Sequence, residues 1–281
     1  MLKTWIFLLL AVPAFANIVG VDSRRSILDR DKRIALDIDD ISMERFGRAT
    51  GYIDCRGKKY SNPELGSAAL VGDEDILVTN AHLLVDEYRR FREPIEECFF
   101  QPQSPNPEHF ELLFTEGNYE VVEDWSAEGG HNDYAVIRLR KKVPGAKAFP
   151  LAPEGFRLEN GQSFVAVSAI GNHPDLFSPW YPVIQGCQVR QYQFGGPGDN
   201  STFLGDCDVE HGQSGSINLI NLNGDWRAVG IIAGGSDDPN LNGVEYSVEK
   251  KSFSFHVAFQ DKLLSAIKRL KRKPALTSLT P

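Results

Sequence analysis

Three short stretches of this sequence carry side chains that together could perform nucleophilic catalysis. Ser214 lies in the run GQSGS (residues 212–216), His82 ends the run VTNAH (78–82), and Asp133 lies in the run NDYAV (132–136). A serine hydroxyl is a weak nucleophile until a neighbouring base removes its proton, and the oxyanion that then develops needs preorganised donors. Each stretch alone has an ordinary reading as a turn or a surface residue. Their joint occurrence favours catalysis.

Short strands must position these residues. His82 follows the apolar run at residues 76–78, and Asp133 precedes the apolar run at 135–137, so each lies at the end of a predicted strand. Further strands are predicted at residues 51–55, 67–71, 111–115, 119–122, 163–170, 183–192, 216–221, 226–233 and 243–248. The run NLNGD (221–225) has hairpin chemistry. Strands of this length and spacing predict an all-β protein made of antiparallel barrels or sandwiches.

The remaining segments divide the chain into units. Residues 17–47 are polar and charged without a sustained helical period, which predicts an exposed N-terminal arm or short pro-segment. Residues 93–109 contain four prolines and predict a surface loop. The run KKVPGAK (141–147) predicts the boundary between a first lobe, residues 48–143, and a second lobe, residues 144–256.

Apolar residues recur at helical spacing near the end of the chain, at Phe259, Leu263, Leu264, Ile267 and Leu270. This period predicts a helix over residues 257–273, followed by a tail at 274–281. Basic residues at 268–273 complement the dipole of a helix C-terminus, which we prefer over a patch for nucleic acid or anionic lipid.

The first 16 residues have the features of a secretion signal. Lys3 supplies a positive charge, residues 6–12 an apolar run, and AFA (14–16) a small-x-small cleavage site. The apolar run is too short to span a bilayer, so we expect export to the periplasm or the medium without stable membrane insertion.

The formal net charge of −8 disfavours nucleic acid as a partner. No metal-ligand spacing is present, and we expect a monomer that needs no cofactor.

The three catalytic runs resemble, in type and order, those of trypsin-like (chymotrypsin-fold) serine endopeptidases. Residues 18–24 (IVGVDSR) resemble the mature N-terminus of the bacterial glutamyl-endopeptidase branch, and GIIAGG (230–235) falls where the family places the strand beside the substrate. The resemblance implies two six-stranded β-barrels with the active site between them. It implies Ser214 as nucleophile, His82 as base, Asp133 as its orienting partner, and the N–H groups of Gly212 and Ser214 as the oxyanion hole.

The same resemblance bears on specificity. An ungapped count places Asp208 at the base of the pocket for the residue before the cleaved bond, where a carboxylate selects arginine or lysine. The other reading is an offset loop in which Asp208 faces solvent. Gly234 and Gly235 would leave the pocket wall open, and His211 either touches substrate or is a solvated loop residue. Ile232 stands where the glutamyl branch carries a histidine, which argues against strict glutamate specificity.

Gln213 is a second departure, because trypsin has an aspartate there that captures the newly cut N-terminus. A neutral glutamine cannot form that ion pair, so activation in the manner of trypsin is not expected.

Four cysteines in an exported chain favour disulfides and allow three connectivities. We favour Cys55 with Cys98 and Cys187 with Cys207, because this connectivity keeps each bond within one lobe.

Two other functions compete with a peptide-cleaving enzyme. An exported α/β-hydrolase esterase also uses a Gly-x-Ser turn, but it needs glycine where Ser216 stands and a histidine after the serine, for which only His256 is available. A non-catalytic binding protein on a protease scaffold is the other alternative, which an active-site phosphonate would distinguish by failing to label Ser214.

Overall fold

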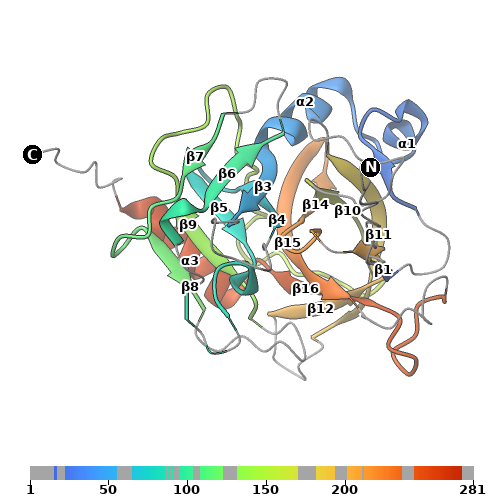
Figure 1. Ribbon diagram of the computed structural model, residues 1–281. Helices are drawn as coiled ribbons and strands as arrows, with labels where there is room; N and C mark the ends of the chain where they lie inside the picture. Colours follow the sequence, from blue (N-terminus) through green and yellow to red (C-terminus); the bar gives the residue numbers. More distant parts are fainter. Residues whose placement is uncertain are drawn as a thin grey trace, which may run out of the picture.

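Two antiparallel β sheets lie side by side in the described chain (Figure 1). The computed structural model describes residues 16–17, 23–55, 65–86, 88, 90–91, 95–103, 108–122, 132–169, 182–193, 201–210, 212–235 and 244–273. The first sheet is formed by strands between residues 50 and 138, and the second by strands between residues 163 and 258 together with residues 25–26, with the connection between the two sheets at residues 139–162.

The first sheet has the strand order β7-β6-β3-β4-β5-β9-β8. Its strands are β3 (Thr50–Asp54), β4 (Leu65–Leu70), β5 (Ile76–Thr79), β6 (Phe99–Pro102), β7 (Phe110–Glu111), β8 (Tyr119–Val121) and β9 (Ala135–Arg138). An isolated bridge between Leu112 and Leu139 brings the β7 edge back toward β9. The sheet is therefore curled into a half-barrel rather than closed.

The second sheet closes on itself, because its first strand also pairs with β11. The order is β10-β14-β15-β16-β12-β11, with β2 added outside β11. Its strands are β2 (Arg25–Ser26), β10 (Ser163–Ser168), β11 (Val183–Tyr192), β12 (Thr202–Gly205), β14 (Ile217–Leu222), β15 (Asp225–Gly235) and β16 (Ser254–Ala258). A separate two-stranded pair joins β1 (Ala16–Asn17) to β13 (Val209–Glu210). The predicted all-β, chymotrypsin-like class is confirmed, with one closed barrel and one curled sheet.

The hairpin between β14 and β15 forms as its sequence indicates. Asn223 and Gly224 both have positive φ, 56° and 87°, as the two-residue turn of a tight hairpin requires. The side chain of Asn221 accepts the Gly224 N–H at 2.6 Å, which fixes the turn. Because the turn is so short, it sets the register that leads from the β14 strand into β15.

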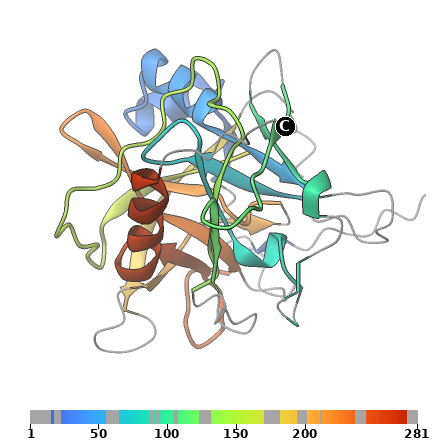
Figure 2. The same cartoon turned by 90° about the vertical axis from the view of Figure 1, so that its left-hand side faces the viewer.

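Helix α3 (Asp261–Arg272) packs along β9 and β5 of the first sheet. In Figure 2 it lies in front of the strands. Its buried residues are Leu263, Ala266, Ile267 and Leu270, in keeping with the predicted helical period. They join an apolar cluster that draws strands from both sheets together with Phe46, Phe149 and Trp226. This shared cluster holds the two lobes against each other.

The expectation of an exposed, non-helical N-terminal arm is wrong. Helices α1 (Arg30–Ala35) and α2 (Asp40–Ala49) lie there, each begun by an aspartate, Asp29 or Asp39, whose side chain accepts a backbone N–H of the first turn. Only Phe46 and Ala49 of α2 are buried, so the apolar signal is too sparse to be seen as a period. Phe46 packs edge-on against Phe149 and Trp226.

The expectation that residues 93–109 form only a loop is also wrong. The short 3-10 helix η2 (Ile95–Glu97) and strand β6 lie within it, and β6 pairs with both β3 and β7. Pro102 is the last residue of β6, where a missing N–H does least harm to the ladder. In the second lobe, residues 244–248 contain isolated bridge residues, such as Ser247 opposite Ser252, instead of the predicted strand, while β12 and β16 were not predicted.

Candidate active site

His82 and Asp133 come from the same end of two neighbouring strands. His82 lies in the short 3-10 helix η1 (Ala81–Leu83) directly after β5, and Asp133 lies two residues before β9. Strands β5 and β9 pair with Thr79 opposite Ala135, so the residues that leave β5 meet those that enter β9. His82 Nδ1 lies 2.6 Å from Asp133 Oδ2, and the His82 N–H donates to Oδ1 at 3.0 Å.

The environment of Asp133 suits the task of orienting an imidazole. Its side chain is 3% exposed, whereas that of His82 is 24% exposed and so reaches the surface. Asn80 donates its side-chain amide to the Asp133 carbonyl at 2.6 Å, which fixes the backbone that carries the carboxylate. With Nδ1–H donating to the carboxylate, Nε2 of His82 is the basic nitrogen. The pair can therefore accept a proton at one defined atom.

Ser214 lies in a turn that two glycines make possible. Gly212 and Gly215 have φ of 89° and 84°, a region that residues with a Cβ rarely adopt. A Cβ on Gly215 would lie 2.0 Å from the carbonyl oxygen of Ser67 and 2.6 Å from Thr79 Oγ1. The turn thus packs directly on β4 and on the end of β5, three residues before His82. No residue other than glycine fits position 215 without a shift of the turn.

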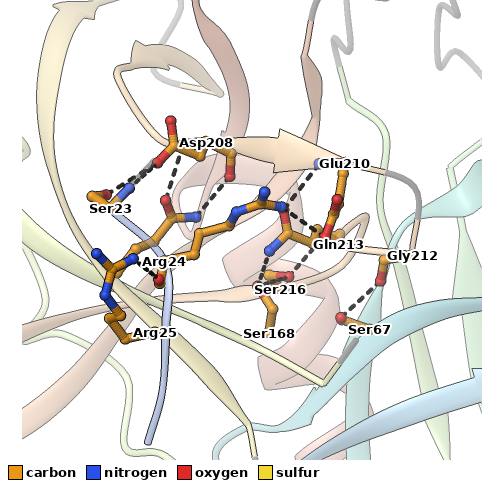
Figure 3. Close-up of polar contacts among 11 residues, drawn as sticks. Ser23, Arg24, Arg25, Ser67, Ser168, Asp208, Glu210, Gly212, Gln213 and Ser216 are labelled. Atoms are coloured by element: carbon orange, nitrogen blue, oxygen red, sulfur yellow. Dashed lines mark hydrogen bonds and ion pairs between the residues drawn. The ribbon is translucent and has the colours of Figure 1, made fainter. Parts of the chain in front are cut away.

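Ser67 of β4 joins the serine turn to the first lobe. Its N–H donates to the Ser214 carbonyl at 2.7 Å. Its hydroxyl donates to the Gly212 carbonyl at 2.9 Å, as Figure 3 shows. Its own carbonyl accepts the Thr79 hydroxyl at 2.7 Å. Ser67 therefore links the strand that leads to His82 with the turn that carries Ser214.

The backbone of the turn leaves two N–H groups available. The N–H groups of Gln213, Gly215 and Ser216 donate to the carbonyls of Glu210, Ile232 and Gln213, respectively. Within the described part of the chain, those of Gly212 and Ser214 have no acceptor. These are the two groups that the sequence suggests for an oxyanion hole, and free donors in a fixed turn are what such a hole requires.

Gln213 is fully buried and ties the turn together (Figure 3). Its side-chain oxygen accepts the Glu210 N–H at 2.9 Å, and its side-chain amide donates to the Ser168 hydroxyl at 3.2 Å. The Ser216 hydroxyl also donates to that of Ser168, at 2.7 Å. The neutral side chain is thus satisfied by hydrogen bonds inside the second lobe, and no ion pair is needed at this position.

Asp208 is buried, 1% exposed, and its carboxylate contacts the N-terminal segment. Its Oδ2 accepts the Ser23 N–H at 2.7 Å and the Ser23 hydroxyl at 3.1 Å. The reading in which Asp208 faces solvent is therefore wrong. Gly234 and Gly235 are half-buried on β15, and a Cβ on Gly234 would meet nothing within 4 Å, so this edge is open. His211 lies outside the described residues.

His256 of β16 lies opposite Ile232 in the sheet and is fully buried. Its ring nitrogens contact the Asn218 amide at 2.9 Å and the Ser254 hydroxyl at 2.8 Å, and its ring stacks on Phe203. Burial lowers the pKa of His256 to about 3, so the ring is neutral at physiological pH. It contributes packing and hydrogen bonds to the barrel next to β15.

Two disulfides close the lobes, and both have the expected pairing. Cys55 is bonded to Cys98 in the first lobe, and Cys187 to Cys207 in the second, shortly before the serine turn. Among the described residues, no group of histidine, cysteine and carboxylate side chains could hold a metal ion. No helix of the described chain is long and apolar enough to cross a membrane.

Several residues of the site carry no signal in the sequence. Ser67 and Ser168 lie in ordinary strand runs, and their roles depend on which strands become neighbours. Arg24 lies in a charged segment that suggests exposure, yet it is 1% exposed and its Nη1 lies 2.7 Å from Glu210 Oε1 (Figure 3). Burial of a charged residue at this point could only be found from the fold.

Comparison with known proteins shows the family and the fold of the chain. The family model described as "Trypsin-like peptidase domain" matches residues 66–231. A Glu endopeptidase solved in complex with MPD superimposes with a TM-score of 0.61 and 12% identity, covering 91% of this chain and 100% of that one. The protease Anisep from Arthrobacter nicotinovorans gives a TM-score of 0.56 and 13% identity, over 79% of this chain and 95% of that one.

A third structure, the thermostable serine protease AL20 from an extremophilic microorganism, gives a TM-score of 0.54 and 16% identity over 78% of this chain and 97% of that one. At these identities the structural neighbours establish the fold alone. A search of curated proteins found no match. The family model covers more than half of the sequence, from β4 to the middle of β15. The chain therefore belongs to the trypsin-like peptidase family and is a serine endopeptidase.

Proposed function

We propose that the protein is an exported endopeptidase that cleaves peptide bonds through an acyl-enzyme on Ser214. His82 takes the proton of the Ser214 hydroxyl and returns it to the leaving amine, while Asp133 orients the imidazole and stabilises its cationic form. The N–H groups of Gly212 and Ser214 bind the oxyanion. The observation that carries this proposal is the short contact of 2.6 Å between His82 and a buried Asp133.

A second observation supports the pairing of the two lobes at this site. Ser67 and Thr79 belong to the first lobe, yet they contact the turn that presents Ser214 from the second lobe. A non-catalytic binding protein has no need for a turn whose glycine packs this closely on the histidine-bearing lobe. The all-β architecture disfavours the esterase alternative, because the α/β-hydrolase fold requires a doubly wound sheet with helices on both faces.

Export is part of the proposal. Both disulfides are of the kind that persists in oxidising compartments, and the first 16 residues have the composition of a secretion signal. N-terminal sequencing of the protein recovered from the periplasm or the medium tests this. A new N-terminus at Asn17 supports export with cleavage after Ala16, and an intact Met1 in the cytoplasm contradicts it.

We propose that the enzyme cleaves after arginine or lysine. This specificity requires that the substrate cation reach the carboxylate of Asp208. We assign Asp208 as the pocket carboxylate; it is buried, and Ser23 holds its Oδ2 with two hydrogen bonds. A substrate cation has to reach the same carboxylate to gain a charge-assisted contact. The open edge at Gly234 leaves room for a long side chain.

The experiment is cleavage of a mixed peptide library by the exported form, with the residue before each cut identified by mass spectrometry. Ser214→Ala is the blank, and Ser265→Ala, an exposed serine on α3, is the matched control that should keep full activity. Cuts after arginine or lysine that disappear in Asp208→Asn support the specificity. Cuts after other residues keep the endopeptidase and overturn the role of Asp208. Turnover retained by Ser214→Ala overturns the mechanism.

A further inference from the structure

A buried ion pair connects the N-terminal segment with the loop that leads to Ser214. Arg24 Nη1 lies 2.7 Å from Glu210 Oε1, and the two side chains are 1% and 5% exposed. Glu210 stands four residues before Ser214 and is the last residue of β13. Charged groups this deeply buried are retained only with a partner, because the loss of one leaves the other uncompensated. Loss of either side chain would therefore leave the charge of the other buried beside the serine turn.

The segment that carries Arg24 is held in place on both sides. Before it, the Ser23 N–H and hydroxyl donate to Asp208 at 2.7 and 3.1 Å. After it, β2 pairs with β11, where Arg25 lies opposite Ile184, and the Ile27 N–H donates to the Pro182 carbonyl at 2.9 Å. Arg24 thus lies directly before an added strand of the closed barrel, β2, and after a residue that is bonded to Asp208 (Figure 3).

Glu210 is in turn hydrogen-bonded to the serine turn through Gln213. The Glu210 N–H donates to the Gln213 side-chain oxygen at 2.9 Å, and the Glu210 carbonyl accepts the Gln213 N–H at 3.1 Å. These two reciprocal bonds close the loop between Glu210 and Gln213, directly before Ser214. A change in the position of Glu210 therefore moves Gln213, and with it the N–H groups of Gly212 and Ser214.

We propose that Arg24 is a positioning residue for catalysis, whose ion pair with Glu210 holds the serine turn in its oxyanion-binding conformation. The cation is a side chain within the chain, so no free N-terminal ammonium is required, in keeping with the neutral Gln213. The proposal rests on the proposed function, since it concerns the same turn. It makes the segment around Arg24 part of the active enzyme rather than a removable arm.

The test replaces Arg24 and compares it with a matched buried pair elsewhere. Arg24→Met removes the charge and keeps the length, and Arg24→Lys keeps the charge. Arg138→Met is the control, because Arg138 also forms a buried pair, with Asp75, but it is anchored to the end of α3 by the carbonyls of Leu270 and Lys273. Melting temperature, kcat and KM are measured for each, with active sites counted by phosphonate titration.

We expect Arg24→Met to lower kcat roughly 10- to 100-fold, with KM within about threefold, because the oxyanion donors lose their fixed positions. Arg24→Lys should recover most of kcat, and Arg138→Met should lose melting temperature but keep kcat for each active site. If Arg24→Met instead behaves like Arg138→Met, with lower stability and an unchanged kcat, Arg24 is only structural and the proposal is overturned.

Two further measurements keep the proposal testable when a variant does not fold or the enzyme does not turn over. The wild-type chain carrying a peptide extension before Asn17 should be as active as the unextended chain; activity only after removal of the extension would overturn the proposal. Amide hydrogen exchange in the Ser214→Ala background requires no turnover. Exchange over residues 207–216 should rise in Arg24→Met and not in Arg138→Met, and equal protection in both would also overturn it.

Discussion

His256 gives the protein a dependence of stability on pH that can be worked out from the structure. The ring is fully buried and neutral, with both nitrogens in contact with Asn218 and Ser254. Burial lowers its pKa to about 3 in the folded protein, against about 6.5 in the unfolded chain. The unfolded chain therefore binds the proton first as the pH falls. The stability contributed by neutral His256 is complete above about pH 6.5 and is lost progressively toward pH 3.

The magnitude follows from the slope of about 1.4 kcal/mol per pH unit between the two pKa values. Between pH 7 and pH 5 this group alone should lower the free energy of unfolding by about 2 kcal/mol. For a protein of this size the corresponding fall in melting temperature is about 4–8 °C. Because the group is fully buried, solvent screening does not reduce the figure.

The assay is urea denaturation of the wild type and of His256→Gln at pH 7 and pH 5. Glutamine keeps a polar partner for Asn218 but does not titrate, so any loss of packing is the same at both pH values and cancels in the difference. The wild type should lose about 2 kcal/mol more than the variant over this range. Equal losses in both proteins would refute the reasoning that burial keeps His256 neutral.

Three other predictions concern the site and the lobes. Gly215→Ala should lower kcat about 100-fold or more, because its Cβ would lie 2.0 Å from the Ser67 carbonyl; Gly155→Ala, with φ of 82° but no neighbour within 4 Å, is the control that should keep kcat. Asp133→Asn should lower kcat about 10⁴-fold with little change in KM, because the imidazole loses its orienting carboxylate; a loss under tenfold in steady-state kinetics would contradict the triad. Replacing Cys187 and Cys207 by alanine should lower the free energy of unfolding by about 3 kcal/mol in denaturant titrations, as expected for a separation of 20 residues; an unchanged midpoint would argue against that contribution.

Local chemistry made much of the site predictable from the sequence. Apolar runs that end at Thr79 and begin at Ala135 place His82 and Asp133 at strand ends, and the structure brings those ends together. The hairpin at Asn223 and Gly224 needs only the two residues of its turn. Each of these features depends on a few neighbouring residues, and sequence patterns report such features well.

The features that were missed depend on partners far away in the chain. Arg24 lies in a run of charged residues. It is buried because it forms an ion pair with Glu210, which is far away in the sequence. Strand β6 ends in Pro102 and pairs with β3 and β7 on either side, so the prolines of residues 93–109 do not exclude a strand there. The aspartates that cap α1 and α2 were visible, but neither helix is long enough to show an apolar period.

The most direct test of the account is labelling with a fluorophosphonate, which forms a stable bond only with a serine activated by its base and oxyanion hole. The exported wild-type protein should incorporate one label, on the peptide that contains Ser214, and Ser214→Ala should incorporate none. Folded wild-type protein that stays unlabelled, or a label on another residue, would contradict the assignment of Ser214, His82 and Asp133 as the catalytic triad.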